Sequence, residues 1–503
     1  MPYILISVAV WLVSSFFGRE RMGRFMLLLL CLWGGYEAFF GLMQLTGNAV
    51  SGHVGYAMTG NFSNPGPYGG FLSLSLSAGA AYLLMTREML FKGKVADKIY
   101  DAAVAMSVFL EAIVLPATMS RAGWLAVAAS VFICVLSEAR FREWATGHRF
   151  KTGVASLLLV LCLAGAFFLK KESALGRLHI WRIECMAFVD NLPFGSGPGT
   201  VLGEYGKAQE AFFRETDRSG TAVRVAGCPE YAFNEYLGAG IEYGLPGLLL
   251  MLSVPVAAIW LLLRRRDPLG YTMVAISVFA FFSYPMSLWQ FKVWLAVLFG
   301  SGFSLGCRLP EFRQRCMALL AGVVLSAAGG CLLYMDIRAE KETGKLWSEA
   351  RYWGAAGLYE DSVESLSPLY DDLKDNYRYL YDLGYALHKT GRYGESNNML
   401  HEGARLSSDP MFHNIMGRNH EELGEYAAAE EEYMISHYMV PSRLYPLVLL
   451  MDMYVRMGRM DDAVAVGERI ASMPVNSRNM TMLRLRQETL ERLDSLRNVV
   501  SYE

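Results

Sequence analysis

Apolar residues form long uninterrupted runs over the first two thirds of the chain. Ten such runs are present, at about 3–17, 25–46, 66–86, 99–118, 122–137, 153–169, 244–263, 269–285, 290–307 and 316–335. A helix needs about 20 residues of this kind to cross the hydrocarbon core of a bilayer. The pattern predicts an all-α, polytopic membrane domain of about ten transmembrane helices over residues 1–335, surrounded by membrane lipids.

Basic residues are concentrated in every second connection between these runs. They occur at 19–24, 87–98, 140–151, 264–266 and 308–315, whereas the loop 47–65 has none. Cytoplasmic loops of membrane proteins carry an excess of Lys and Arg. We therefore expect five loops in the cytoplasm, and both termini and the long loop 170–243 on the opposite face of the membrane.

A different period begins after Tyr334. Gly357, Gly391, Gly424 and Gly458 are spaced by 34, 33 and 34 residues, and each is followed by an amphipathic helical pattern. A helix–turn–helix unit of 34 residues is the signature of tetratricopeptide repeats. The pattern predicts a tetratricopeptide α-solenoid over residues 338–503, outside the cytoplasm, with a concave face that suits a protein partner.

Charge separates the same two parts. Residues 336–503 carry 19 basic and 28 acidic residues, and the first 335 carry 27 basic and 20 acidic residues. Neither part has the strongly basic surface of a nucleic-acid-binding protein, so no nucleic-acid partner is expected. The chain has no Asp-x-Asp pair and no cluster of His and Cys residues, which argues against a metal site. Cys185 and Cys228 share the loop 170–243 and are candidates for a disulfide in an oxidising compartment.

Arginines beside the membrane are the first candidates for chemistry. Arg121 lies where one apolar run ends and the next begins, and its guanidinium suits a two-pronged contact with an anionic headgroup. An interface residue that only extends toward water is the alternative interpretation, and both stay open on the chemistry alone. Arg177, Trp181 and Arg182 follow on an amphipathic segment, before a bend at 195–199 whose glycines free backbone N–H groups.

Four ordered segments together resemble the O-antigen ligase/polymerase superfamily of bacterial membrane proteins. They are Thr59–Pro65, the Ser120–Arg121 turn, Gly176–Gly199, and Tyr231–Leu237 with Glu242–Gly247. The resemblance covers about residues 25–310, and a C-terminal tetratricopeptide array is also similar to some members. It implies a GT-C-like membrane enzyme of the bacterial inner membrane, with the loop 170–243 and the repeats in the periplasm.

The resemblance implies an inverting glycosyl transfer that needs neither a metal nor another cofactor. The donor would be a glycan on undecaprenyl pyrophosphate, and the acceptor a hydroxyl. Fixed arginines would stabilise the charge that develops on the leaving pyrophosphate, here Arg121, Arg177 and Arg182. Asn234, Glu235 and Trp181 would support the site.

One position departs from the family pattern. Many members have a His before the Asn of the Tyr231–Leu237 segment, where it is thought to activate the acceptor hydroxyl. This chain has Phe233 there, which accepts no proton. Glu230 and His179 are the remaining candidates for a catalytic base, because a base must reach the acceptor proton. Glu230 as a solvated loop carboxylate is the alternative.

Three acceptors are compatible with the resemblance. Lipid A–core oligosaccharide would make the protein an O-antigen ligase, which we favour; a second lipid-linked repeat would make it a polymerase; and a protein hydroxyl would make it a protein O-oligosaccharyltransferase. A membrane-anchored repeat scaffold that has lost activity with its His is the alternative of a different class. Fold does not separate these, because function depends on the site.

Overall fold

A computed structural model describes residues 1–138, 143, 146–148, 150, 151, 153, 171–215, 220–302, 312–474 and 479–500. Within these residues the protein is helical and contains no β-strand, which confirms the all-α expectation. The chain divides into two compact units. The first comprises residues 1–171, 233–236 and 248–337, and the second comprises 172–232, 237–247 and 338–503.

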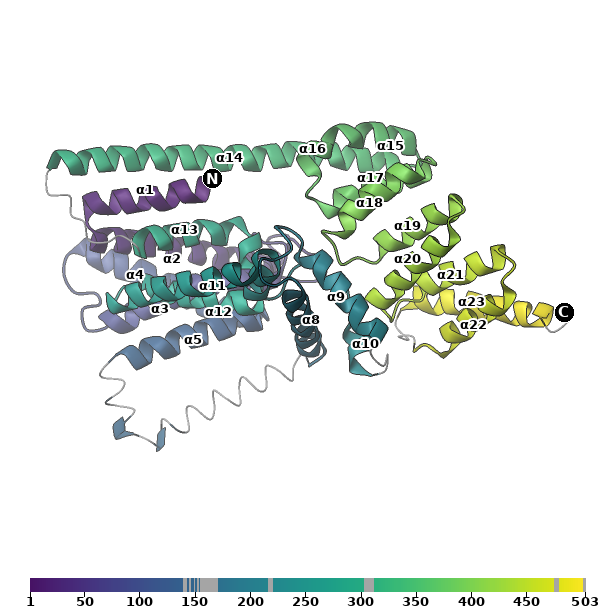
Figure 1. Cartoon of the computed structure of the whole chain (residues 1–503). Helices are drawn as coiled ribbons and strands as arrows, with labels where there is room; N and C mark the ends of the chain where they lie inside the picture. Colours follow the sequence, from purple (N-terminus) through teal and green to yellow (C-terminus); the bar gives the residue numbers. More distant parts are fainter. Residues whose placement is uncertain are drawn as a thin grey trace. The chain divides into compact units, whose positions relative to one another are not determined.

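The first unit consists of apolar helices (Figure 1). They are α1 (Pro2–Phe17), α2 (Arg19–Leu45), α3 (Pro65–Thr86), α4 (Val95–Ala117), α5 (Arg121–Ser137), most of α11 (Glu235–Arg264), α12 (Leu269–Phe282), a 3₁₀ turn η1 (Pro285–Ser287), α13 (Trp289–Gly302) and the first part of α14 (Phe312–Ala355). Five helices, α2 from Glu20 onward, α3, α4, α11 and α14, are long and apolar enough to cross a membrane. The protein is therefore a multi-pass membrane protein.

The ten expected spans are not confirmed as a count. The helices α1, α5 and α12 are apolar but have only 16, 17 and 14 residues. Residues 154–169 of the expected span 153–169 and the basic residues at 140, 142, 149 and 308 lie outside the described residues. The number of crossings and the orientation of the loops stay predictions.

Helix α3 is the centre of the first unit. It packs against α2, α4, α5 and α12, and it is buried along almost its whole length. Small residues allow this close packing: a Cβ at Gly70 would lie 2.2 Å from the ring of Phe279 on α12. Two hydroxyl groups donate hydrogen bonds between helices: Ser75 Oγ to Leu30 O and Thr272 Oγ1 to Leu74 O (both 3.2 Å). Buried hydroxyls of this kind are the usual polar contacts between helices in lipid.

The second unit combines three loop helices with a series of helical pairs. The loop helices are α8 (Lys171–Asp190), α9 (Val201–Glu215) and α10 (Thr221–Val225). The pairs, in the green-to-yellow part of Figure 1, are the end of α14 with α15 (Tyr359–Leu366), α17 (Tyr377–Lys389) with α18 (Tyr393–Ala404), α19 (Met411–Glu422) with α20 (Tyr426–Met439), and α21 (Tyr445–Arg456) with α22 (Met460–Ser472). Between α15 and α17 lie η2 (Ser367–Leu369) and α16 (Tyr370–Leu373), and α23 (Met480–Val500) ends the series.

The four periodic glycines occupy equivalent turns between the helices of each pair. Gly357, Gly391, Gly424 and Gly458 have φ angles of 82°, 78°, 76° and 74°. Residues with a side chain rarely adopt this left-handed conformation, so a glycine after each first helix ends it and lets the second begin. Each helix from α17 onward contacts the next along the chain. The assignment of these pairs to the tetratricopeptide family stays a prediction.

The loop 170–243, expected within the membrane domain, has its helices in the second unit. Tyr205, Phe212 and Phe213 form one apolar face of α9, and they share a buried cluster with Ile183 of α8 and Tyr438 of α20. An amphipathic helix must bury its apolar face against another element. For α9 that element is α20, which lies more than 200 residues later in the chain.

Candidate functional site

In the first unit, the structure brings together the starts of two helices that carry family motifs. Asn64 caps α3 by accepting a hydrogen bond from Gly66 N (2.9 Å). Ser120 caps α5 by accepting from Gly123 N (3.4 Å), and its hydroxyl donates to Gly66 O (3.1 Å). The Thr59–Pro65 and Ser120–Arg121 motifs are therefore neighbours, although 54 residues separate Gly66 from Ser120.

Glycines make this approach possible. A Cβ at Gly69 would lie 2.4 Å from the Cβ of Ser120, and a Cβ at Gly123 would lie 2.6 Å from Gly69 O. Neither position accommodates a larger residue without moving a helix. Arg121 is the first residue of α5 and is partly exposed. A helix start presents free N–H groups and a positive dipole end, which together with a guanidinium favour a bound anion.

Two side chains of α2 hold the Thr59–Pro65 motif. The Oε1 atom of Gln44 accepts from the backbone N–H groups of Thr59 (2.9 Å) and Gly60 (2.8 Å). The carboxyl group of Glu37 accepts from Asn61 N (3.0 Å) and Asn61 Nδ2 (3.1 Å). Both side chains are buried, at 5% and 3% exposure. The conformation of this motif therefore depends on polar residues inside an apolar helix.

A further motif attaches to the first unit at the end of α12. The ring of Phe233 contacts that of Tyr284 (5.9 Å between centroids), and Glu235 Oε1 accepts from Met286 N (2.7 Å). Asn234 is buried, and its Oδ1 accepts from Tyr236 N (3.0 Å) at the start of α11. Asn234 and Glu235, expected to support the site, thus hold the backbone where α11 begins.

This motif lies at the same end of the first unit as Arg121. Thr272, early in α12, contacts Leu74 of α3, and Phe279, near its end, contacts Gly70. The two helices are therefore antiparallel, and α12 ends where α3 begins. The start of α3 is next to Ser120, so one end of the helical unit gathers three of the motifs.

The remaining motifs lie in the second unit. Arg177, Trp181 and Arg182 are on α8, with Arg177 and Trp181 four residues apart and hence on one face. Both are partly buried, whereas Arg182 is exposed and its guanidinium lies 4.7 Å from the centre of the Phe212 ring. The helix thus carries two cationic groups, of which Arg182 lies against the Phe212 ring.

His179 is enclosed on the other side of α8. It is 7% exposed, its Nε2 lies 3.1 Å from Gln209 Oε1, and its ring contacts Phe212 and Phe213. Burial lowers the pKa of His179; the bond to Gln209 raises it, and the charge of Arg182 lowers it. A buried, neutral imidazole that is hydrogen-bonded to a fixed amide suits a structural role better than proton transfer to a ligand.

The glycine bend at 195–199 binds another part of the chain, not an open phosphate site. Ser196 N and Gly197 N donate to the carbonyls of Ile241 and Glu242 (2.9 and 3.0 Å), and Gly199 N donates to Glu242 Oε1 (2.8 Å). The expectation that this bend frees its N–H groups is therefore wrong. A Cβ at Gly244, where φ is 65°, would lie 2.0 Å from Pro193 O, so the Glu242–Gly247 motif provides a close-fitting partner for the bend.

Residues 106–252 match the sequence model of the family described as O-antigen ligase. This segment resembles an O-antigen ligase domain. The matched segment is less than a third of the chain, but it contains Arg121, Arg177, Trp181, Arg182, Glu230, Asn234 and Glu235. The match supports a likeness to membrane glycosyltransferases of the ligase/polymerase type over this segment. A search of curated proteins finds no match to the chain.

The second candidate base, Glu230, also lies within the matched segment. Glu230 is exposed and forms an ion pair with Arg378 of α17 (2.9 Å). Three residues later, the ring of Phe233 packs edge-on against that of Tyr284. The two candidates for a disulfide, Cys185 and Cys228, are both free in the structure, and Cys228 Sγ lies 3.1 Å from Arg443 Nη2.

Sequence reasoning missed the residues that hold the motifs in place. Glu37 and Gln44 interrupt an apolar run, and an ionisable or amide group at such a position was itself a signal. Gln209 is one of many polar residues of a loop, so no pattern distinguished it. Among the described residues, no group of three His, Cys, Asp or Glu side chains is placed to hold a metal ion.

Proposed function

We propose that this protein is a membrane glycosyltransferase that moves a glycan from undecaprenyl pyrophosphate to an acceptor hydroxyl, and specifically an O-antigen ligase that acts on lipid A–core. One observation carries the proposal. Arg121, inside the matched segment, begins α5 beside the start of α3, where its guanidinium and the positive dipole end of α5 favour a pyrophosphate. The site would lie on the periplasmic face of the inner membrane.

The reaction exchanges one bond at the anomeric carbon for another. The acceptor oxygen attacks this carbon from the face opposite the leaving pyrophosphate, so the configuration inverts, and the acceptor proton passes to a base or to solvent. Negative charge grows on the pyrophosphate as its bond to the sugar breaks. Arg121 would stabilise that charge through fixed donors without the need for a metal, and the family resemblance gives the same role to Arg177 and Arg182.

Glu230 is the better candidate for the base. A carboxylate paired with Arg378 is exposed and can meet an acceptor, whereas His179 is buried and hydrogen-bonded to Gln209. An oxocarbenium-like transition state with a good leaving group also needs little help from a base. We therefore expect a smaller loss from Glu230→Gln than from removal of an arginine.

Protein O-oligosaccharyltransferase is the second candidate, and the series of helical pairs favours it. If these pairs are tetratricopeptide repeats in the periplasm, they offer a surface for a protein acceptor or partner. The acceptor decides between the two functions. Free lipid A–core with long lipid-linked chains in a deletion strain indicates a ligase, underglycosylated proteins indicate the second function, and single repeats indicate a polymerase.

Complementation of the deletion strain tests the proposal. We expect Arg121→Ala to lower glycan transfer about 10²–10³-fold at equal protein level, the usual loss for one donor to a developing oxyanion. Arg121→Lys should restore transfer only in part, because an ammonium group lacks the planar pair of donors. Arg266→Ala, at an exposed arginine of the same unit, is the matched control. Transfer close to normal in Arg121→Ala would refute the proposed pyrophosphate site.

A further inference from the structure

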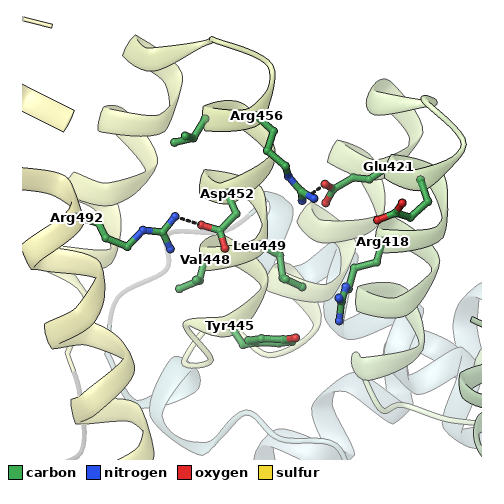
Figure 2. Close-up of a pocket in the computed structure, with 10 residues that line it drawn as sticks. Arg418, Glu421, Tyr445, Val448, Leu449, Asp452, Arg456 and Arg492 are labelled. Atoms are coloured by element: carbon green, nitrogen blue, oxygen red, sulfur yellow. Dashed lines mark hydrogen bonds and ion pairs between the residues drawn. The ribbon is translucent and has the colours of Figure 1, made fainter. Parts of the chain in front are cut away.

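Two cavities of the second unit differ in the residues that line them. One, which we call the charged cavity, has about 510 Å³ and lies between α19, α21 and α23. Figure 2 shows its ion pairs, Arg456 with Glu421 and Arg492 with Asp452. The other, which we call the aromatic cavity, has about 550 Å³ and is lined by Trp347, Tyr377, Tyr381, Phe412 and Glu230 among others. Both volumes fall in the range of about 300–1,000 Å³ of small-molecule sites.

Aromatic rings form much of the aromatic cavity. Trp347 on α14 and Tyr377 and Tyr381 on α17 line the cavity, and each of these residues is partly exposed. Phe412 is 1% exposed and packs edge-on against Tyr381, with 5.3 Å between centroids. By contrast, Tyr445 is the one aromatic residue of the charged cavity. Packing such as that of Phe412 against Tyr381 already restricts these rings, so little conformational freedom is lost when a ligand contacts them.

The charged groups of the aromatic cavity are already paired. Asp382 accepts from Trp347 Nε1 (2.9 Å) and forms an ion pair with Arg351 (3.2 Å). Glu230 forms its ion pair with Arg378, whose guanidinium also lies 5.6 Å from the centre of the Tyr377 ring. Burial raises the pKa of Asp382, against the opposing effects of Trp347 and Arg351. Groups that compensate one another in this way need no charged ligand, and they offer fixed donors and acceptors to a neutral one.

This combination matches the chemistry of a pyranose. A sugar ring has an apolar C–H face, which packs on an aromatic ring, and a rim of hydroxyls, which both donate and accept hydrogen bonds. Carboxylates accept from hydroxyls and guanidinium groups donate to them. A phosphate-rich ligand is disfavoured, because Glu230, Asp382 and Asp409 outnumber the two lining arginines. A basic peptide would gain from those carboxylates but would compete with the arginines that already pair with them.

We propose that the aromatic cavity binds a saccharide segment, either of the acceptor or of the lipid-linked glycan. The proposal rests on the proposed glycosyl transfer and extends it. Glu230 lines the cavity and lies three residues before Phe233. Position 233 is the one at which the family resemblance places the residue that activates the acceptor. The helical pairs then take part in substrate binding themselves, because Trp347, Tyr377 and Tyr381 belong to them.

Saturation-transfer NMR on the purified full chain in detergent tests the proposal. Two probes are used, both released by mild acid from lipopolysaccharide of the bacterium that carries the gene: the core oligosaccharide and the O-antigen oligosaccharide. We expect at least one to bind, with transfer to its C–H protons. Binding should weaken at least tenfold in Trp347→Ala and in Tyr377→Ala, the second of which keeps the Trp347–Asp382 hydrogen bond. The probe that binds more tightly identifies the acceptor or the donor glycan as the source.

Two matched controls separate the cavity from a general loss of structure. Trp353→Ala removes an exposed ring from the same helix as Trp347, and Tyr445→Ala removes the ring of the charged cavity. Both should bind the oligosaccharide as the wild type does. Equal losses in the controls, no binding of either probe, or binding of an Arg- and Lys-rich peptide at this cavity in place of a saccharide would each overturn the inference.

The outcome is distinguishable from failure of the proposed function. If transfer in membranes depends on Arg121 but neither oligosaccharide binds, the glycosyltransferase stands and the saccharide site fails. If an oligosaccharide binds through Trp347 and Tyr377 but no transfer of any glycan depends on the protein, the site stands as a saccharide-binding module and the proposed reaction fails.

Discussion

The two units hold their motif-bearing segments through buried polar side chains of different kinds. In the first unit this side chain is a carboxyl group. Glu37 accepts hydrogen bonds from Asn61 N and Asn61 Nδ2, and its Oε1 lies 3.4 Å from Trp33 Nε1. In the second unit, a neutral amide does so: Gln209 Oε1 accepts from Tyr205 (2.6 Å) and lies 3.1 Å from His179, while its Nε2 donates to Gly227 O and Met439 O (3.0 and 2.5 Å).

The difference lies in what each side chain connects. Glu37 joins a loop to the apolar helix that precedes it, a local contact in which one ionisable group serves several donors. Gln209 is 1% exposed and joins α8, α9 and the segment after α10 to α20, and both its donors and its acceptor are used. The second unit is thus held together by residues far apart in sequence, and changes in the helical pairs should reach α8 through this amide.

Removal of the Glu37 carboxyl group should have the largest effect. Glu37→Leu removes the acceptor of three hydrogen bonds from the exposed Asn61 and the half-buried Trp33, at about 1 kcal/mol for each lost bond. We expect the Tm of the full chain in detergent to fall by about 6–12 °C, which corresponds to about 3 kcal/mol in a domain of this size. Glycan transfer should fall with it. Glu20→Leu, at an exposed carboxylate of the same helix, is the control, and an equal fall there would show that Glu37 has no special role.

Gln209→Leu should have the next largest effect. The substitution leaves Gly227 O and Met439 O without their donor and Tyr205 without its acceptor, a cost of about 2–4 kcal/mol after partial relaxation. Hydrogen exchange should become faster in α8, α9 and residues 226–232, while α3 and α4 stay protected. Lys207→Leu, on the exposed side of α9, is the control. Unchanged exchange in α8 would show that the amide does not connect the loop to the helical pairs.

Much of the fold follows from the sequence, and the site only in part. Apolar runs predict where α2, α3, α4, α11 and α14 lie, because a bilayer requires about 20 apolar residues in succession. The periodic glycines predict the turns, because few other residues adopt a positive φ there. These are local signals, and each depends on neighbouring residues.

Contacts between distant residues escaped the same reasoning. Nothing in the sequence near Gln209 indicates Met439, and nothing near Glu230 indicates Arg378. The glycines at 195–199 suggested an anion site because their partners, Ile241 and Glu242, lie about 45 residues later. Residue types indicated Arg121 correctly as a residue at a helix start, but the second helix start beside it depends on the packing of Gly69 against Ser120.

Acid should lower the stability of the second unit more in the wild type than in a variant that lacks His179. Burial holds the pKa of His179 below its ordinary value of 6.5. The imidazole therefore stays neutral in the folded protein at a pH where the same imidazole binds a proton in the unfolded chain. The stability contributed by the neutral form is present above pH 6.5 and is lost as pH falls through 6.5 toward the lowered value, by at most about 1.4 kcal/mol per pH unit. His388 shifts in the same direction through burial.

Thermal unfolding at pH 7.5 and pH 5.5 measures this effect. Between pH 7.5 and pH 5.5, the Tm of the wild type should fall further than the Tm of His179→Gln. In that variant a neutral amide replaces the imidazole beside Gln209. His401→Gln, at an exposed histidine of α18, should behave as the wild type does. An equal loss in His179→Gln would place the acid sensitivity elsewhere.

The exposed ion pair between α9 and α20 should contribute least, and it sharpens the contrast with Gln209. Arg214 Nη2 and Glu431 Oε1 are 2.8 Å apart, but the side chains are 40% and 56% exposed, so solvent screens the attraction. Such pairs contribute about 0–1 kcal/mol. Arg214 also contacts Glu210 and the Tyr438 ring, so a double-mutant cycle of Arg214→Ala with Glu431→Ala isolates the pair. We expect a coupling energy below about 1 kcal/mol; a value as large as the Gln209→Leu effect would mean that surface charge, rather than the buried amide, joins the loop helices to the helical pairs.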